Sequence, residues 1–385
     1  MAQKRLVLFL DMSIRTSQDL VKGVVRYFKS HDDWTLHIEP GFSVKQLPGI
    51  NIADTLTGVS AVLIQSLHTM ELENFVKKLK IPVIAAVDKK ISGCINILSD
   101  ESKIAETAYS ALVENGFENL AFYGYRNQIF STERRKAFTK KLKSANLTVN
   151  EYQDDYYEHL FTWSLDTEKL TQWLKDLPKP IGIMCCCDHT AFRLVNTCKE
   201  IGIRIPEQVA VLSVGDNNLI CSLNNPEISS ITMDFEHAGY IGAEMLEKAA
   251  DEKKKTTKHI LVPPKYVSKR HSTDILITPN DEVTKAIRYI HNNIDNLTGV
   301  SDVLKVTSLS RRHLERRFKE IFNRTIYEEI RRVRVQQITK LLLDTNLTVS
   351  EIAYTLGYMG DSHIRRYFKA ETGLTPLEFR KKTRK

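Results

Sequence analysis

Short apolar runs rich in branched residues alternate with amphipathic stretches along the chain as far as residue 280. Six apolar runs predict strands, at residues 5–10, 59–64, 82–87, 120–123, 181–187 and 209–214. Six amphipathic stretches predict helices, at residues 17–29, 71–80, 103–114, 133–144, 191–201 and 236–249. A parallel sheet with helices on both faces requires this alternation. The pattern predicts a doubly wound α/β body, and the number of alternations favours two similar lobes joined at a hinge.

The last hundred or so residues follow a different pattern, which is helical and repeats itself. Residues 314–319 (LERRFK) match residues 364–369 (IRRYFK), fifty positions further on. Each copy predicts a short helix, a turn and a basic helix, which is the order of a helix-turn-helix unit. The helices are expected at residues 300–306, 310–321, 349–355 and 361–370, with a long spacer helix at 326–343. The tail is therefore predicted to be an all-α domain with two helix-turn-helix units.

The charge of the chain is concentrated in this tail. Residues 1–280 carry 34 basic and 34 acidic side chains, whereas residues 281–385 carry 21 and 13, so the net charge of +8 lies in the tail. A neutral body with a basic appendix is typical of a regulator whose tail approaches a polyanion, although a solvated basic surface would look the same. We divide the chain into a ligand-sensing body (1–274), a linker (275–281) and a DNA-binding tail (282–385).

The sequence lacks the motifs that are typical of several classes of function. The apolar runs are far shorter than the about 18 residues that span a membrane, and no signal peptide is recognisable, which predicts a cytoplasmic protein without a membrane partner. The six cysteines show no paired CxxC spacing, so we expect no metal and no cofactor. Phosphate-binding glycine loops and hydrolase motifs are also missing, which argues against an enzyme. An enzyme built from scattered residues remains the alternative.

Candidate ligand-binding residues follow the predicted strands, because open α/β sheets bind ligands beyond the carboxyl ends of their strands. Carboxylates accept hydrogen bonds from hydroxyl groups and arginine donates in a fixed fork, so such a set suits a neutral polyol. Each residue alone is compatible with a helix cap or a surface charge; their recurrence favours a site. The candidates are Asp11, Gln65, Asp88, Asp188 and Asp216, with Arg134 in the helix after residues 120–123.

The body resembles the sugar-binding domain of the lactose/galactose repressor family. The likeness lies in residues 181–235, where a strand ends in Asp188 and a helix, the segment GIRIPE and another strand follow, and in residues 131–134 (STER). The resemblance implies that Arg134 and Asp188 grip a sugar. Two departures stand out: Asp216 lies one residue beyond the usual position of the acidic contact, and Cys187 replaces an amide residue.

The tail resembles the DNA-binding domain of the arabinose-regulator family over essentially its whole length. The most specific segments are residues 352–358 (IAYTLGY), 367–369 (YFK), 372–376 (TGLTP) and 379–380 (FR). The first unit departs from that pattern, with Thr307 at the turn glycine and Asn323 at the position of Gly373. Asparagine tolerates a left-handed backbone, so the second change is mild.

This resemblance implies that the second helix of each unit lies in the DNA major groove. Leu314, Phe318, Ile364 and Phe368 are expected to face the core. Six residues on the opposite stripe are expected to reach bases: Arg312, Glu315, Arg316, Ser362, His363 and Arg366. Lys319 and Lys369 are expected to contact phosphates.

The combination of such a body with such a tail resembles a family of bacterial activators of xylose catabolic genes. Segments along the body share this likeness, at residues 121–124 (AFYG), 260–264 (ILVPP) and 270–274 (RHSTD). The resemblance implies a homodimeric activator that binds D-xylose and an operator in double-stranded DNA and acts on RNA polymerase. Another sugar such as arabinose or ribose, a non-sugar effector such as a purine, and action as a repressor remain alternatives.

Overall fold

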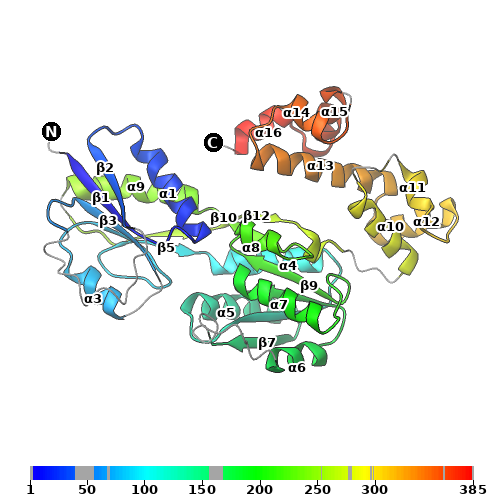
Figure 1. Cartoon of the computed structure of the whole chain (residues 1–385), viewed down its shortest axis with the longest axis horizontal. Helices are drawn as coiled ribbons and strands as arrows, with labels where there is room; N and C mark the ends of the chain where they lie inside the picture. The colour runs from blue at the N-terminus through cyan, green and yellow to red at the C-terminus, as the bar shows by residue number, and fades with distance from the viewer. Residues whose placement is uncertain are drawn as a thin grey trace. The chain divides into compact units, whose positions relative to one another are not determined.

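The computed structural model shows two compact units, Met1–Thr273 and Asp274–Lys385 (Figure 1). It describes residues 3–39, 56–66, 70–155, 168–252, 254–275, 280–294, 297, 299–358 and 360–383. Within these residues, no helix is long and apolar enough to cross a membrane.

The first unit contains two lobes, each built on a six-stranded sheet. The sheet of lobe 1 has the order β11-β5-β4-β3-β1-β2, and all its strands are parallel. Its strands are β1 (Lys4–Phe9), β2 (Trp34–Glu39), β3 (Ala61–Gln65), β4 (Val83–Ala86), β5 (Ile95–Ser99) and β11 (Lys258–Val262). Its helices include α1 (Arg15–Phe28), α3 (Met70–Lys78) and α9 (Phe235–Asp251).

The sheet of lobe 2 has the order β12-β10-β9-β8-β6-β7, in which only the described strand β12 runs antiparallel. The strands are β6 (Asn119–Tyr125), β7 (Val149–Asp154), β8 (Ile181–Cys185), β9 (Val209–Val214), β10 (Ser229–Met233) and β12 (Pro264–Ser268). The helices are α4 (Glu101–Val113), α5 (Ile129–Ser144), α6 (Glu168–Asp176), α7 (Asp188–Glu200) and α8 (Asn218–Leu223), followed by the short 3₁₀ helix η3 (His271–Thr273).

The chain passes between the lobes three times, so neither lobe is continuous in sequence. It leaves lobe 1 after β5, returns after β10 to form α9, and crosses again between β11 and β12. Helix α9 packs on α1, and the two backbones meet at glycines: a Cβ on Gly23 would lie 1.9 Å from the carbonyl oxygen of Glu236. A Cβ on Gly239 would lie 2.2 Å from the carbonyl oxygen of Leu20.

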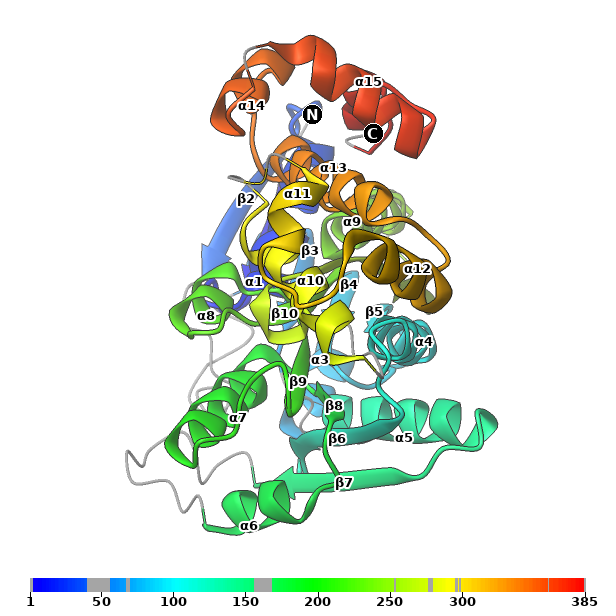
Figure 2. The same ribbon diagram turned by 90° about the vertical axis from the view of Figure 1, so that its right-hand side faces the viewer.

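The second unit is all helical (Figure 2). Its helices are α10 (Asp281–Asn292), α11 (Val300–Leu304), α12 (Arg311–Phe322), α13 (Ile326–Asp344), α14 (Val349–Thr355), α15 (Asp361–Thr372) and α16 (Pro376–Thr383). One apolar cluster joins α10, α11 and α12 to the first half of α13, and a second joins the rest of α13 to α14, α15 and α16. The two copies of the repeat thus share α13.

The two basic helices end in the same way, as their repeat in sequence predicts. Asn323 ends α12 and Gly373 ends α15, both in the left-handed region with φ of 51° and 74°. Capping boxes begin α13 and α14, where Thr325 pairs with Glu328 and Thr348 with Glu351. These local signals fix where each helix starts and stops.

Candidate functional site

A cleft of about 1830 Å³ lies between the two lobes of the first unit. Residues at the carboxyl ends of strands in both lobes line it, as expected for open α/β sheets. Five of the six candidate residues lie on this cleft: Asp11, Gln65, Asp88, Arg134 and Asp188. The sixth candidate, Asp216, is not among the described residues that line the cleft.

Arg134 is held rigidly in the wall of the cleft. Its side chain projects from α5 and is only 6% exposed. The Nε and Nη2 atoms donate to the two carboxylate oxygens of Glu101 at 2.8 and 2.9 Å, and Nη1 donates to the carbonyl oxygen of Cys186. A guanidinium fixed by a bidentate carboxylate keeps its charge and its orientation. Arg134 therefore presents a preorganised donor group to the cleft.

Asp188, the first residue of α7, uses much of its hydrogen-bonding capacity inside lobe 2. Its Oδ1 accepts from the hydroxyls of Ser213 (2.6 Å) and Ser230 (2.8 Å), and Oδ2 accepts from the backbone N–H of Asn217 (2.8 Å). Burial raises the pKa of Asp188 above its usual value, and these hydrogen bonds oppose the rise. The carboxylate forms a fixed, partly satisfied edge of the cleft.

Asp216 lies in a polar network that joins β10 to the end of the unit. Its carboxylate accepts from Arg270 Nη2 (2.8 Å) and from the hydroxyls of Thr232 and Ser268 (both 2.7 Å). Its backbone is left-handed, with φ of 56°, and the side chain is nearly buried. These contacts are internal to the protein. The backbone N–H of Asp216 donates to Ser230 Oγ (2.9 Å), whose hydroxyl donates to Asp188, so the two aspartates are neighbours, although Asp216 is not among the described residues that line the cleft.

Lobe 1 contributes hydrogen-bond acceptors to the cleft. Burial raises the pKa of Asp88 to about 6, although nearby Arg134 lowers it. The Oε1 atom of Gln65 is buried and has no partner in the described part of the chain, while its Nε2 donates to Thr16 Oγ1 at 3.1 Å. Asp11 is exposed and accepts from the backbone N–H of Ser13 at 2.8 Å. A buried acceptor without a partner costs free energy until a donor reaches it.

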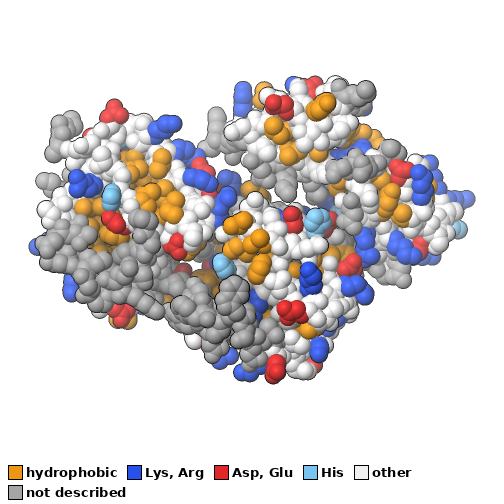
Figure 3. Space-filling view, viewed as in Figure 1, with side chains coloured by type: hydrophobic (Ala, Val, Ile, Leu, Met, Phe, Trp, Pro, Cys, Tyr) orange, Lys and Arg blue, Asp and Glu red, His pale blue; other side chains and the backbone are white. Residues whose placement is uncertain are grey.

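The second unit presents a basic surface along α12. Arg312, Arg316 and Lys319 are exposed, and they line a groove of about 720 Å³ together with Glu315. Glu315 accepts from Arg311 Nε at 2.9 Å. Leu314 and Phe318 on the opposite stripe are fully buried. Lys and Arg side chains gather over this end of the unit (Figure 3).

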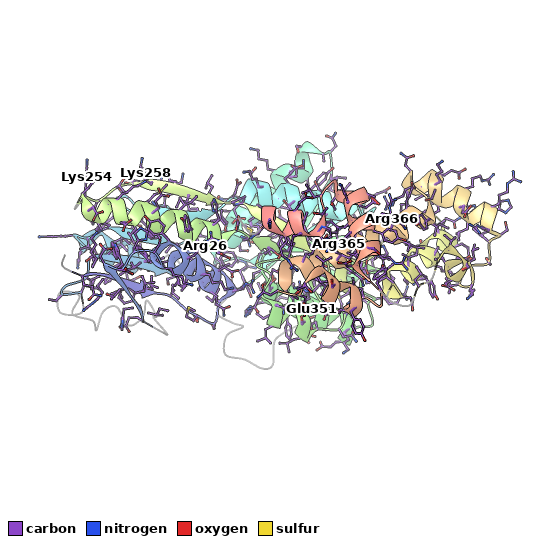
Figure 4. The ribbon with its side chains drawn as sticks, turned by 90° about the horizontal axis from the view of Figure 1, so that it is seen from above. Arg26, Lys254, Lys258, Glu351, Arg365 and Arg366 are labelled. Carbon is purple, nitrogen blue, oxygen red and sulfur yellow. The ribbon has the colours of Figure 1, made fainter. Side chains whose placement is uncertain are left out.

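Helix α15 repeats this arrangement. Ser362, Arg366 and Lys369 are exposed, and Ile364 and Phe368 are fully buried. Arg365 pairs with Asp361 within the helix at 2.8 Å, and Arg365 and Arg366 lie close together in Figure 4. The side chain of His363 lies outside the described residues.

Comparison with known proteins identifies the family of this chain. Residues 109–273 match the model of the periplasmic binding protein-like domain, and residues 303–382 match that of a helix-turn-helix domain. The xylose operon regulatory protein of Haemophilus influenzae is 32% identical over 287 residues, which cover 74% of each chain. The chain belongs to the xylose operon regulatory protein family.

The likeness to this family extends over the whole chain. The xylose operon regulatory protein of Escherichia coli strain K12 is 26% identical over 389 residues, covering 98% of this chain and 96% of that protein. A solved structure described as a xylose-binding transcription activator is 25% identical, with a TM-score of 0.67 and coverage of 99% and 98%. These matches confirm the predicted two-lobed body and helix-turn-helix tail. The chain is a DNA-binding transcriptional regulator and not an enzyme.

Some cleft residues of this family member were missed by the sequence analysis. Glu101, which orients Arg134, is the first residue of α4 and follows strand β5 by two residues. The rule of polar residues after strands would have pointed to this segment if the strand had been recognised. Phe130 and Phe192 also line the cleft, and the ring of Phe130 lies 5.8 Å from the guanidinium of Arg134. On amphipathic helices such aromatic residues look like core positions, and no local signal separates the two roles.

Proposed function

We propose that the chain is a D-xylose-responsive activator of pentose catabolic genes and that the cleft binds the sugar. The observation that carries this proposal is the cleft itself, in which a preorganised Arg134 meets the acceptors Asp88 and Gln65. Hydroxyl groups of a neutral sugar both donate and accept, so they match this mixture of groups. The names of the relatives, a xylose operon regulatory protein and a xylose-binding activator, favour xylose among the sugars.

In this proposal the cleft residues have different roles in binding the sugar. Arg134 donates to one hydroxyl, Asp88 and Gln65 accept from others, and Asp188 and Asp11 contribute further oxygens at the edges of the cleft. The faces of Phe130 and Phe192 cover the apolar side of the sugar ring. Asp216 acts indirectly, because its carboxylate holds Arg270, Thr232 and Ser268 rather than the ligand.

We propose that the two basic helices read the operator. Arg312, Arg316 and Arg366 would bind guanine edges, with Glu315, Ser362 and His363 as further base contacts and Lys319 and Lys369 on phosphates. The exposure of the described basic side chains and of Ser362 in this set, and the burial of the opposite stripe, support this assignment.

Sugar binding would close the two lobes and shift a cytoplasmic homodimer towards the arrangement that fits two half-sites and contacts RNA polymerase. The sugar must bind the DNA-competent state more tightly, because a ligand with equal affinity for both states shifts nothing. The body (1–274) would transmit this change through the linker (275–281), whose residues 276–279 lie outside the described part, to the tail (282–385).

Calorimetric titration with D-xylose, L-arabinose, D-ribose and glucose tests the proposal. We expect saturable binding of xylose that is lost in Arg134→Ala and retained in Arg135→Ala, the adjacent arginine that pairs with Glu151. Thermal unfolding of both variants checks that each is folded. Absence of binding to every sugar would refute the xylose assignment, and binding of a purine instead would favour the non-sugar alternative.

A further inference from the structure

Tyr327 lies where the long helix α13 approaches both basic helices, α12 and α15. It is the second residue of α13, and its side chain is 51% exposed. It lines the groove along α12, where Arg312, Arg316 and Lys319 also lie. Helix α13 contacts both α12 and α15 (Figure 2).

The hydroxyl of Tyr327 also faces α15. It lies 3.5 Å from the hydroxyl of Tyr367, a distance well beyond the about 2.7–2.8 Å of a good O–H···O hydrogen bond. Beside it, Arg331 Nε donates to Glu371 Oε1 at 2.7 Å and ties α13 to α15. The hydroxyl of Tyr327 therefore lies at the junction of α13 and α15 without a short hydrogen bond in the described part of the chain, and it can donate to a further acceptor.

The charges around this hydroxyl favour an anion. Arg331 and Arg366 are near enough to act on its titration, and Tyr327 lines the same groove as the basic side chains of α12. The hydroxyl of Tyr367 raises the pKa of Tyr327, and the two arginines only oppose that rise. At neutral pH the phenol therefore keeps its proton and is a neutral donor.

We propose that Tyr327 donates a hydrogen bond to a DNA phosphate located between the two major-groove segments that α12 and α15 read. The inference rests on the proposed operator-reading surface. Two recognition helices in successive grooves leave a stretch of backbone between them, and tyrosine hydroxyls are among the groups that bind phosphate oxygens. Such a contact sets the position of both helices and does not select a base.

Loss of a neutral hydrogen-bond donor and loss of a basic residue should change the salt dependence of DNA affinity differently. Replacing Lys319 removes a charge and should flatten the dependence of log affinity on log salt by about 0.9 per phosphate contact. Tyr327→Phe removes only a hydroxyl, so the affinity should fall by about two- to tenfold with the salt slope unchanged. The fall should be equal for operator and unrelated DNA.

The experiment measures binding of the full chain to a DNA fragment selected from a random pool, over a series of KCl concentrations. Tyr327→Phe is compared with Lys319→Ala and with the control Tyr354→Phe, which removes an 85% exposed phenol from α14. Substituting single phosphates by neutral methylphosphonates should locate one position at which the effects of the DNA change and of Tyr327→Phe are not additive. Thermal unfolding confirms that the variants are folded.

Three results would overturn the inference: unchanged affinity in Tyr327→Phe, a loss confined to one DNA sequence, or an equal loss in Tyr354→Phe. If Lys319→Ala and Arg316→Ala also leave DNA binding unchanged, the proposed surface itself is refuted and the inference falls with it. A loss in the lysine variant alone refutes only the role of Tyr327.

Discussion

At the scale of single residues, the site was predictable where local geometry decides it. A side chain that follows a parallel strand lies at the carboxyl edge of its sheet, and this rule placed Asp11, Gln65 and Asp88 at the cleft. Asp216 also follows a strand, β9, but its carboxylate accepts from Arg270, 54 residues further along the chain, and it is not among the described residues that line the cleft. The sequence around residue 216 contains no signal that predicts this ion pair with Arg270.

Replacing Asp88 should raise the stability of the protein but weaken its binding of sugar. The pKa of Asp88 is raised from 3.8 to about 6, so above pH 6 its charge costs stability, and the cost disappears as the pH falls through 6 towards 3.8. Asp88→Asn should therefore stabilise the sugar-free protein by about 1 kcal/mol at pH 7.5 and by less at pH 5. The same variant should bind sugar more weakly, because it lacks the charged acceptor.

Urea unfolding at both pH values and calorimetry with xylose check this. The control is Asp11→Asn, an exposed aspartate on the same cleft, whose stability should not change. A destabilised Asp88→Asn protein would contradict the explanation.

At the scale of helices and strands, buried central elements were predicted and several strands with more polar residues were missed. Strand β9 was found with the same bounds, because all its residues are buried and apolar or small. The edge strands β2 and β7 were missed, since at least half the residues of WTLHIE and of VNEYQD are polar and neither has a continuous apolar run. Strand β10 (SSITM) was missed because its serines and threonine interrupt the apolar run, although all its residues are buried.

The packing of α9 on α1 gives a test within one helix. Gly239→Ala should destabilise the body by about 1–3 kcal/mol, because its Cβ would meet the backbone of Leu20, which cannot move aside. Gly242→Ala, one turn along α9, is the matched control: its Cβ would meet only side-chain ends, the nearest being Ile97 Cδ1 at 3.2 Å. Urea unfolding of the two variants should separate them, and equal stabilities would contradict the close approach.

A buried ion network joins the helices of the DNA-binding unit and predicts a pH dependence. Glu329 is fully buried and accepts from Arg332 and His291, and His291 also contacts Asp274. Burial lowers the pKa of His291, but Asp274 and Glu329 raise it overall to about 9. Because the folded pKa exceeds the unfolded one, the stabilisation is complete below about pH 6.5 and is lost as the pH rises through 9.

Calorimetric unfolding between pH 6.5 and 9.5 measures this effect. The free energy of unfolding of the helical unit should fall by an amount on the order of 2 kcal/mol over this range. In His291→Gln the free energy of unfolding should be lower than in the wild type at pH 6.5 and almost independent of pH. A wild-type unit with constant stability across the range would refute the role of His291.

At the scale of the whole molecule, the sensor and the DNA-binding unit are separate compact bodies, and regulation requires that their binding equilibria be linked. The sequence predicted both bodies because each has its own periodicity and charge. The resemblance to known families also implied the return to lobe 1 after residues 226–232 and the crossing at residues 258–273. The strand pairings on either side of each crossing were not predicted, since they depend on contacts between distant strands.

Linkage makes a quantitative prediction for the intact chain. If saturating xylose raises the affinity for the operator by about tenfold, saturating operator must raise the affinity for xylose by the same factor. Fluorescence titrations of DNA with and without sugar, and calorimetry of sugar with and without DNA, measure the two factors. Arg134→Ala should keep its sugar-free DNA affinity and lose the response, whereas a response to xylose that persists in this variant would place the effector elsewhere.

The three crossings between the lobes also determine when the sensor can form during synthesis. The sheet of lobe 1 is completed by β11 on β5, and that of lobe 2 by β12 on β10. The sheet of lobe 1 therefore cannot be completed until the ribosome has released residue 262, and that of lobe 2 not until it has released residue 268. The nascent chain must carry unfinished sheet edges until then. The helical unit follows with mostly local contacts, so the growing polypeptide acquires a ligand-competent sensor before it gains the means to bind a promoter.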